Sequence, residues 1–510
     1  MRVEVDQAPL RRLGQSAGMK LVVNPAALTQ AEVEAAQLQK LDRAGPNYTS
    51  YPSADRFVDS FGPEQYRQSL RQRAQGPVVG GGSAWSLAVH AAFGESPGHG
   101  HDCVGWLTRE VELHRKELGS QQPVSQLQLR CCSGAGKPSR LPAFLNNDEL
   151  DQLMRLLRGA FRIVPGAELS IDADPRTASP ARLRHFCDLG FNHLSFSAQA
   201  ISADLQQQES DSESDSGRVS ERVSERDSER DSESVSGLVA EARALRFESI
   251  QADLIYALPQ QTPEAFKRTV TQMAALHPTR IALRAHAGLP QGSRPPRGIG
   301  DGAPPHSKQA HQAEQAEQRL QMRASAIAGL TRQGYVHIGM DHFALPTDAL
   351  AIAKRQGRLY RSLQGYTTQP DCDLIALGVS ATGCIGATYS QNAKTLPAYQ
   401  AALAQGRFPV VRGLALSRDD LLRRSVIMAI LCQGRVEFES IELAHLVKVS
   451  ESFAPELQRL QAFEALGLVH VNAQEIQVTD KGCFHIRAIA MVFDRYRPPA
   501  DAREHFSRVV

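Results

Sequence analysis

This chain of 510 residues has no long apolar run and no strong charge of either sign. No segment approaches the ~20 apolar residues that a membrane-spanning helix needs, and the start M-R-V-E-V-D-Q-A-P-L lacks the apolar stretch of a secretion signal. The formal net charge of +2 argues against a protein that coats nucleic acid. We therefore expect a cytoplasmic protein that spans no membrane and binds no nucleic acid.

Cysteine is also scarce, with eight residues in the whole chain. They are too few and too irregularly spaced for the disulfide framework of a secreted protein, so a reducing compartment is expected. Because 42% of the residues are apolar, the chain can fill a substantial core, and widespread disorder is excluded. The length allows two domains, or one large α/β barrel with an added domain.

Short strand-like runs alternate with amphipathic helical stretches from residue 76 onward. This order is typical of a parallel sheet or barrel that binds ligands at the carboxyl ends of its strands. We expect strands at 86–90, 127–129, 168–171, 193–196 and 251–255, and helices that include 147–161 and 263–276.

Breaks in this pattern divide the chain into three parts. The predicted parts are an N-terminal extension (1–40), a barrel (41–355) and a mainly helical C-terminal domain (356–510). Within the barrel, 207–237 is a charged low-complexity insertion with R-V-S-E and R-D-S-E repeats, and 291–306 is a loop rich in Gly and Pro. A helix, two short strands around Asn472 and another helix give a winged-helix-like order, but the mixed charges favour packing over DNA binding.

Four sequence blocks, in this order along the chain, point to one family. They are G-P-N-Y-T-S-Y-P at 45–52, D-L-I-Y-A-L-P-Q-Q-T-P-E at 253–264, G-M-D-H-F-A at 339–344 and Q-G-Y-T-T-Q at 364–369. Together they resemble the oxygen-independent coproporphyrinogen III oxidases, which are radical S-adenosylmethionine enzymes of haem biosynthesis. The resemblance implies an incomplete parallel (β/α) barrel of the radical S-adenosylmethionine type with a C-terminal, mainly helical domain.

The resemblance also implies two cofactors, a [4Fe-4S] cluster and S-adenosylmethionine. In the family, a C-x-x-x-C-x-x-C loop holds the cluster, and the reaction is the oxidative decarboxylation of coproporphyrinogen III to protoporphyrinogen IX. The corresponding positions here are Gly94, Gly98 and His101. Because two glycine side chains cannot ligate iron, we expect this copy to be catalytically impaired or inactive.

Four nearby residues are weak substitutes for the missing cluster ligands, namely His101, Cys103, Cys131 and Cys132. Histidine replaces cysteine in some clusters, and a mononuclear zinc site from the same residues is an equally weak alternative. The glycine-rich loop and the altered spacing favour an eroded surface loop instead.

Several residues correspond to family positions at the cofactor site, some with a similar side chain and some with a different one. Asp172 stands where the family has a Glu that binds the cofactor ribose, and Ala88 replaces a Tyr beside the cluster. Six further residues match family positions. Gly134 and Gly136 lie in the segment that receives the methionine end of the cofactor, which here follows an inserted R-C-C-S at 130–133. Gln199 and Asp253 match positions in the cofactor pocket, and Ala287 and Ile338 match positions that pack near adenine.

The substrate that the resemblance implies is a porphyrinogen-type small molecule, and we expect a monomer. Tyr366 and Gln369 either cover this substrate or form a packed turn, and Asp341 with His342 either positions a propionate or closes a barrel strand. One alternative function is a non-catalytic porphyrin- or haem-binding protein, with His342 or His286 as axial ligand. Another is a regulatory partner of an intact paralogue, and a gene without selected function agrees with the repetitive insertion.

Overall fold

The computed structural model describes residues 48–75, 84–92, 100–132, 145–175, 177–198, 235–258, 261–286, 305–369 and 373–496. For residues 75, 90–92, 100–102, 131–132 and 305–316 it describes the backbone alone. The predicted N-terminal extension, most of the charged insertion and most of the Gly- and Pro-rich loop therefore lie outside the described residues.

A single twelve-stranded sheet, with the strand order β14-β13-β12-β11-β1-β2-β3-β4-β5-β6-β8-β7, forms the centre of the molecule. The strands from β11 through β1 to β6 pair in parallel. This confirms the predicted incomplete parallel barrel and all five predicted strands. The bounds are β1 Trp85–Ala92, β2 Gln122–Cys132, β3 Phe161–Ala173, β4 His193–Ser197, β5 Ser249–Tyr256, β6 Arg280–Ala285, β7 Val336–Gly339, β8 His342–Ala344, β11 Leu374–Gly378, β12 Thr382–Ile385, β13 Thr388–Asn392 and β14 Val410–Ala415.

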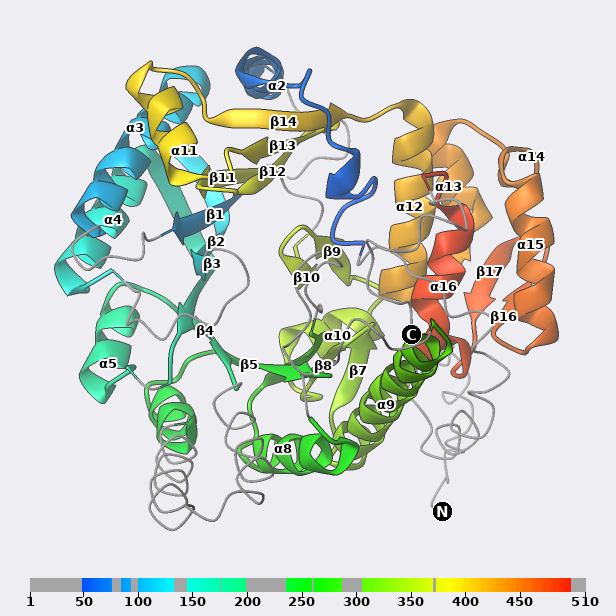
Figure 1. The fold of residues 1–510 in the computed structure, drawn as a ribbon. Coiled ribbons are helices and arrows are strands. Elements are labelled where there is room, and N and C mark those ends of the chain that lie inside the picture. Colours follow the sequence, from blue (N-terminus) through cyan, green and yellow to red (C-terminus); the bar gives the residue numbers. More distant parts are fainter. Residues whose placement is uncertain are drawn as a thin grey trace, which may run out of the picture.

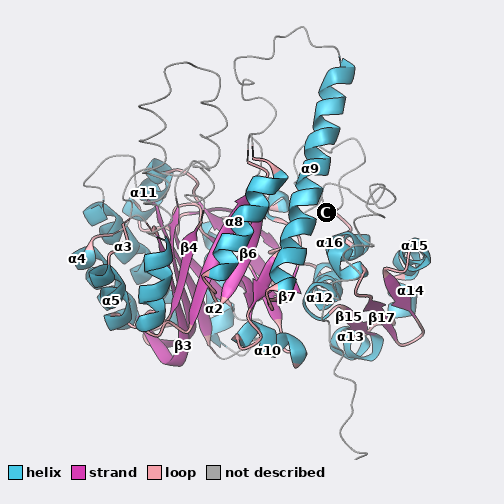
Figure 2. Cartoon of the chain, turned by 90° about the horizontal axis from the view of Figure 1, so that it is seen from below, coloured by secondary structure: helices cyan, strands magenta, loops and turns pink. Residues whose placement is uncertain are grey.

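Helices surround the convex face of this sheet (Figure 1). They are α2 Pro63–Gln75, α3 Gly100–Leu118, α4 Asn147–Ala160, α5 Pro180–Asp188, α8 Pro263–Ala275, α9 Pro305–Arg332 and α11 Leu396–Ala404. Helix α10 Ala349–Arg355 lies beside β7, and its Leu350 lines the inside of the barrel. Figure 2 shows that α9 extends well beyond the edge of the sheet. None of the described helices is both long and apolar enough to cross a bilayer.

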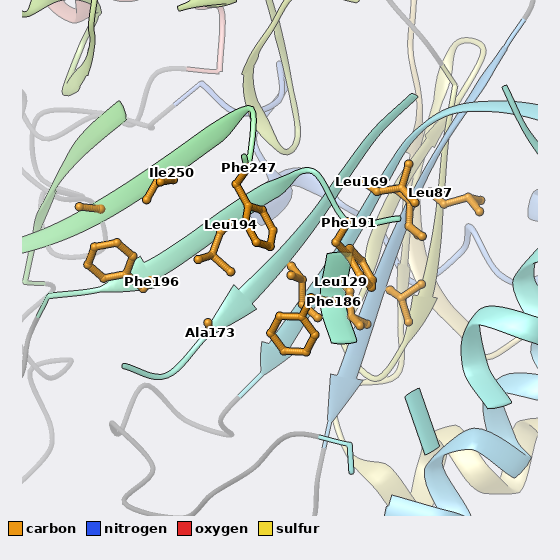
Figure 3. Close-up of a cluster of buried hydrophobic side chains, with 14 of the residues drawn as sticks. Leu87, Leu129, Leu169, Ala173, Phe186, Phe191, Leu194, Phe196, Phe247 and Ile250 are labelled. Atoms are coloured by element: carbon orange, nitrogen blue, oxygen red, sulfur yellow. The ribbon is translucent and has the colours of Figure 1, made fainter. Parts of the chain in front are cut away.

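The main core lies between the sheet and these helices. Strand side chains that point outward, such as Leu87, Leu129 and Leu194, pack against helical side chains such as Phe186 of α5 (Figure 3). Each of these four side chains is at most 3% exposed, and burial of one such side chain contributes about 1.5–3 kcal/mol. Successive side chains of a strand point to opposite faces of the sheet. The residues between these apolar ones therefore point into the barrel, and many of them are polar.

The sheet continues past residue 355, where the sequence predicts a domain boundary. Strands β11 to β14 lie beyond that residue, and β11 pairs directly with β1. In the sequence between β8 and β11, strands β9 Tyr360–Ser362 and β10 Gly365–Thr367 form a hairpin, which is a separate two-stranded sheet. The separate C-terminal unit therefore begins near Arg418 rather than at residue 356.

The C-terminal unit is mainly helical, as predicted, with a small sheet of order β15-β17-β16. Its own core contains side chains such as Ile427, Leu460 and Phe493. The predicted winged-helix-like order of helix, two strands and helix is confirmed by α15, β16, β17 and α16. The bounds are α12 Arg418–Gln433, β15 Arg435–Glu437, α13 Phe438–His445, α14 Val449–Ser452, α15 Ala454–Ala465, β16 Val469–Val471, β17 Glu475–Val478 and α16 Ile486–Ala490.

The segment 48–62, which we call the N-terminal segment, connects the two units and runs between β14 and α12 (Figure 1). Tyr48 belongs to the core of the C-terminal unit, and its hydroxyl donates a hydrogen bond of 2.9 Å to Asp494. Further along the segment, Val58 forms a backbone bridge with Gly413 at the edge of the large sheet. The segment therefore fixes the C-terminal unit against the barrel.

Candidate functional site

The inside of the barrel is polar. On β2, Gln126, Gln128 and Arg130 face inward, whereas Leu127 and Leu129 belong to the outer core. With inward-facing side chains of the neighbouring strands, these residues surround an inner cavity of about 90 Å³. Other polar residues in its wall are Glu168, Ser170, His193, Ser195, Gln251, Arg280, Arg284 and His342.

Asp172, predicted to bind a cofactor, lies near the carboxyl end of β3. Its carboxylate accepts a hydrogen bond from the Ser195 hydroxyl of β4. Burial raises the pKa of Asp172 above its usual value, although the Arg130 guanidinium opposes this shift. A carboxyl group at this edge can accept hydrogen bonds from the hydroxyls of a bound ligand.

Asp253 on β5 is the second carboxylate among the predicted cofactor residues. It accepts a 2.6 Å hydrogen bond from Arg284 Nε of β6 and a 2.9 Å hydrogen bond from Gln251 Nε2. Strand β4 lies between β3 and β5, and Ser197 pairs with Asp253 as Ser195 pairs with Asp172. The carboxylates of Asp172 and Asp253 therefore lie on two strands that are separated by one strand, β4.

His342 lines the inner cavity from β8. Its ring stands edge-on to that of Tyr366, with 5.3 Å between centroids, and Nδ1 has no hydrogen-bond partner within the described part of the chain. Burial lowers the pKa of His342 to about 3, and Arg361 and Arg284 add to the effect. The imidazole is therefore neutral near pH 7.

The inner cavity is too small for haem. Ligand pockets usually enclose about 300–1,000 Å³, against about 90 Å³ here. A macrocycle with His342 as axial ligand would need to displace strand side chains on several sides. The other proposed axial ligand, His286, lies at the end of β6, where its backbone N–H donates to the Tyr256 carbonyl at 2.8 Å.

The block 364–369 lies at the floor of the barrel, at the amino ends of the strands. Gln126 of β2 donates to the Thr367 hydroxyl at 2.7 Å, and the Thr368 hydroxyl donates to Glu168 of β3 at 3.2 Å. The Tyr366 ring lines the inner cavity while its hydroxyl donates to a backbone carbonyl of α12. For Gln369, the structure gives a 3.1 Å bond from its backbone N–H to the Thr367 hydroxyl. This arrangement matches the packed turn more closely than a cover over the carboxyl ends.

Ile338 on β7 is only 1% exposed and packs in a cluster with Leu350, Tyr366 and Cys432. Its side chain therefore contributes to the junction between β7 and α12, and contact with a cofactor remains a prediction. Gly134, Gly136, Gln199 and Ala287 lie outside the described residues, as do Gly94 and Gly98.

Asp341, which was expected either to position a propionate or to close a strand, forms a joint between the two units. Its carboxylate accepts a 2.9 Å bond from Arg323 of α9 and a 3.1 Å bond from Arg487 of α16. All three side chains are at least 80% buried. The Asp341 carboxylate therefore links Arg323 of the barrel to Arg487 of the C-terminal unit.

Of the four proposed substitutes for the cluster ligands, only Cys103 has a described side chain. Cys103 of α3 packs against the main core, and burial raises the pKa of its thiol to about 12, so the thiolate that iron requires is disfavoured. His101 lies in the first turn of α3, and Cys131 and Cys132 end β2, but their side chains are outside the described set. Within the described residues, no group of three or more His, Cys, Asp or Glu side chains is placed to hold a metal ion.

A second cavity of about 240 Å³ lies between the N-terminal segment and the barrel, and we call it the segment cavity. Arg130, Gln128 and Gln364 line both cavities, so the two are neighbours. This cavity was not predicted, because it forms only where the N-terminal segment lies across β1 and β2. The remaining lining residues are Tyr48, Thr49, Ser50, Ser53, Ala54, Ala88, Leu363, Leu374 and Thr382.

Comparison with known proteins gives consistent matches over most of the chain. The family model "HemN C-terminal domain" matches residues 416–485. The oxygen-independent coproporphyrinogen III oxidase of Escherichia coli (strain K12) is 36% identical over 497 residues, covering 94% of this chain and 99% of the relative. The enzyme of the same name from Pseudomonas aeruginosa is 34% identical, covering 93% and 98%. A solved structure of the Escherichia coli coproporphyrinogen III oxidase, described as a radical SAM enzyme, superposes with a TM-score of 0.72 at 35% identity and covers 88% of this chain and 98% of its own.

Proposed function

Because this chain belongs to the oxygen-independent coproporphyrinogen III oxidase family, we propose that it binds a porphyrinogen-type tetrapyrrole without carrying out the family's cluster-dependent oxidation. The observation that carries the proposal is the pair of glycines, Gly94 and Gly98, at two of the three cluster-ligand positions. Cys103, the nearest described thiol, supports it because its thiol is held protonated in the core.

The tetrapyrrole is placed at the mouth of the barrel. The inner cavity is too small for a macrocycle, whereas ligands of parallel barrels bind at the carboxyl ends of the strands. Arg130 and Arg284 line the inner cavity from positions near the carboxyl ends of β2 and β6, and their charges suit a ligand with several carboxylates. We place the protein in the cytoplasm as a monomer, which agrees with the free thiols of Cys187, Cys432 and Cys483.

We expect anaerobic reconstitution with iron and sulfide to leave the wild-type protein without a stoichiometric cluster. The matched control is the triple variant Gly94→Cys, Gly98→Cys and His101→Cys, which restores the family ligands and should hold about four iron atoms per chain. Iron counting and electron paramagnetic resonance after reduction measure both proteins. A full [4Fe-4S] signal from the wild type that shifts with S-adenosylmethionine would overturn the loss of the oxidation.

We also propose that S-adenosylmethionine still binds. Its ribose hydroxyls would donate hydrogen bonds to Asp172, and Asp253 would form part of the same binding site. These carboxylates fit a group with two adjacent hydroxyls, and the chemistry that this cofactor supplies in the family is a radical generated at a cluster. Asp172→Asn keeps an oxygen for Ser195 but removes the charge, and it should weaken binding about 10-fold or more in calorimetry. Equal affinity in the variant and the wild type would exclude Asp172 from the site. Glu112→Gln, on the outer surface of α3, is the control.

A further inference from the structure

The segment cavity has an unusual charge composition. Among its described lining residues Arg130 is the only charged one, and the rest of the polar wall consists of hydroxyls and amides such as Thr49, Ser50, Gln128 and Gln364. A cavity with one guanidinium and no carboxylate carries a net positive charge. It therefore favours an anionic ligand.

Arg130 differs from the other arginines that line these two cavities. Arg280 is paired with Asp348 at 2.9 Å, and Arg284 is paired with Asp253 at 2.6 Å. Arg130 Nε is buried and has no hydrogen-bond partner anywhere in the described chain. The Arg130 charge lowers the pKa of Asp172, whose carboxylate accepts a hydrogen bond from the Ser195 hydroxyl. A buried guanidinium N–H without a partner is costly, and an external acceptor would satisfy it.

The space beside Arg130 exists because of local sequence choices. Ala88, at the centre of β1, is the small residue that borders the cavity, where the family resemblance places a tyrosine. Arg130 itself belongs to the stretch 130–133 that interrupts the family pattern. A larger side chain at position 88 would occupy space that the structure leaves open.

We propose that the segment cavity binds one carboxylate group through Arg130. Two sources carry this chemistry, a free small organic acid and a propionate arm of a tetrapyrrole whose macrocycle stays at the barrel mouth. The second source rests on the proposed function, and the first does not. A guanidinium matches a carboxylate with two parallel hydrogen bonds, and Gln128 and Gln364 offer further amide donors at the same junction.

The test compares two probes on the full chain, sodium propionate and coproporphyrin III. Propionate should raise the thermal unfolding midpoint of the wild type in a saturable way, as ligand linkage requires. Coproporphyrin III should bind in a fluorescence titration, and its tetramethyl ester, which lacks the charges, should bind more weakly. Arg130→Gln should weaken binding of at least one of the two acids about 10- to 100-fold, the range expected for a lost charged hydrogen bond.

Two further variants keep the result interpretable. Ala88→Leu retains Arg130 but fills the cavity, so it should weaken the same acid that Arg130→Gln weakens. Arg407→Gln removes an exposed guanidinium that contacts Gln405 away from both cavities, and it should leave binding unchanged. Ala88→Leu tests the cavity without removing the charge of Arg130. Arg407→Gln tests whether the loss of any one positive charge weakens binding.

The outcomes distinguish the inference from the proposed function. Tetrapyrrole binding that is unchanged in Arg130→Gln, together with no Arg130-dependent effect of propionate, overturns the inference and leaves the proposed function standing. Arg130-dependent binding of propionate without binding of the tetrapyrrole supports the inference and removes the proposed ligand. If neither probe binds the wild type, both the inference and the proposed function are overturned.

Discussion

Replacing Asp341 by asparagine is expected to lower the free energy of unfolding by about 3–5 kcal/mol. The substitution keeps the shape of the side chain but leaves Arg323 and Arg487 buried without their carboxylate. Burial by itself raises the pKa of Asp341, yet the two guanidinium groups outweigh it and hold the pKa below its usual value. Urea unfolding at pH 7, followed by circular dichroism, measures the loss.

Asp419 provides a matched control for this experiment. It also lies between two arginines, Arg423 at 3.0 Å and Arg495 at 2.7 Å, but its side chain is 40% exposed. Solvent screens such a pair, so Asp419→Asn should cost no more than about 1 kcal/mol. Equal losses from the two substitutions would contradict the structural role of Asp341, since burial is the main difference between the two sites.

Glu110 should make the stability of this protein depend on pH in the range from 5 to 8. This carboxyl on α3 accepts hydrogen bonds from the Tyr399 hydroxyl at 2.6 Å, the Gly378 N–H at 2.8 Å and the Asn392 amide at 2.8 Å. Burial raises the pKa of Glu110 to about 7, although the three hydrogen bonds oppose the shift. Since the usual value is 4.5, the folded state binds the proton more tightly than the unfolded chain.

The sign follows from this difference in proton affinity. The stabilising contribution of Glu110 is complete below about pH 4.5 and is lost as the pH rises through 7. A shift of about 2.5 pKa units at 1.36 kcal/mol each is worth about 3.4 kcal/mol over the whole titration, and about 2.5 kcal/mol of it is lost between pH 5 and 8. Glu110→Gln does not titrate, so its free energy of unfolding relative to the wild type should rise by that amount over the same interval.

The comparison with Glu110→Gln matters because other buried groups titrate in the opposite direction. Burial lowers the pKa of His114 to about 4, and it lowers the pKa values of His337 and His485 to about 3 and about 4. These histidines favour the folded state as the pH rises through their unfolded value, so the total pH profile mixes both signs. Urea unfolding of both proteins at several pH values isolates the share of Glu110. If the difference in free energy of unfolding between the wild type and Glu110→Gln stays constant from pH 5 to 8, the pKa of Glu110 is not raised in the folded state.

The parallel half of the sheet was predictable because each strand carries a clear pattern. In β3, for example, buried Leu169 and Ile171 alternate with Ser170 and Asp172. The strands between residues 360 and 415 were missed, because this stretch was assigned to the mainly helical C-terminal domain. Strands β9 to β13 have three to five residues each, too few for an alternation to register, and the fully buried run of β11 has no periodicity that separates a strand from a helix.

Asp172 and Asp253 were assigned from positions matched to the family, and the structure places them on β3 and β5, two strands of the parallel part of the sheet. Their role in binding a cofactor stays a prediction. Asp341 and Arg130 were not understood, because their roles depend on partners distant in sequence. Arg487 lies 146 residues after Asp341, and the segment cavity needs a chain crossing from residues 48–54. No local pattern records either contact.

The contact between Tyr48 and Asp494 has a consequence for how the molecule is made. The two residues are 446 positions apart, so a ribosome that adds roughly 5–20 residues per second needs on the order of a minute to supply the second after the first. During that interval the two tyrosines of the N-terminal segment, Tyr48 and Tyr51, lack the core that later buries them to 1% exposure. The contacts of the N-terminal segment are therefore completed only when the end of the chain has been made, and a nascent protein stopped short of α16 would present these aromatic side chains to chaperones or to neighbouring chains.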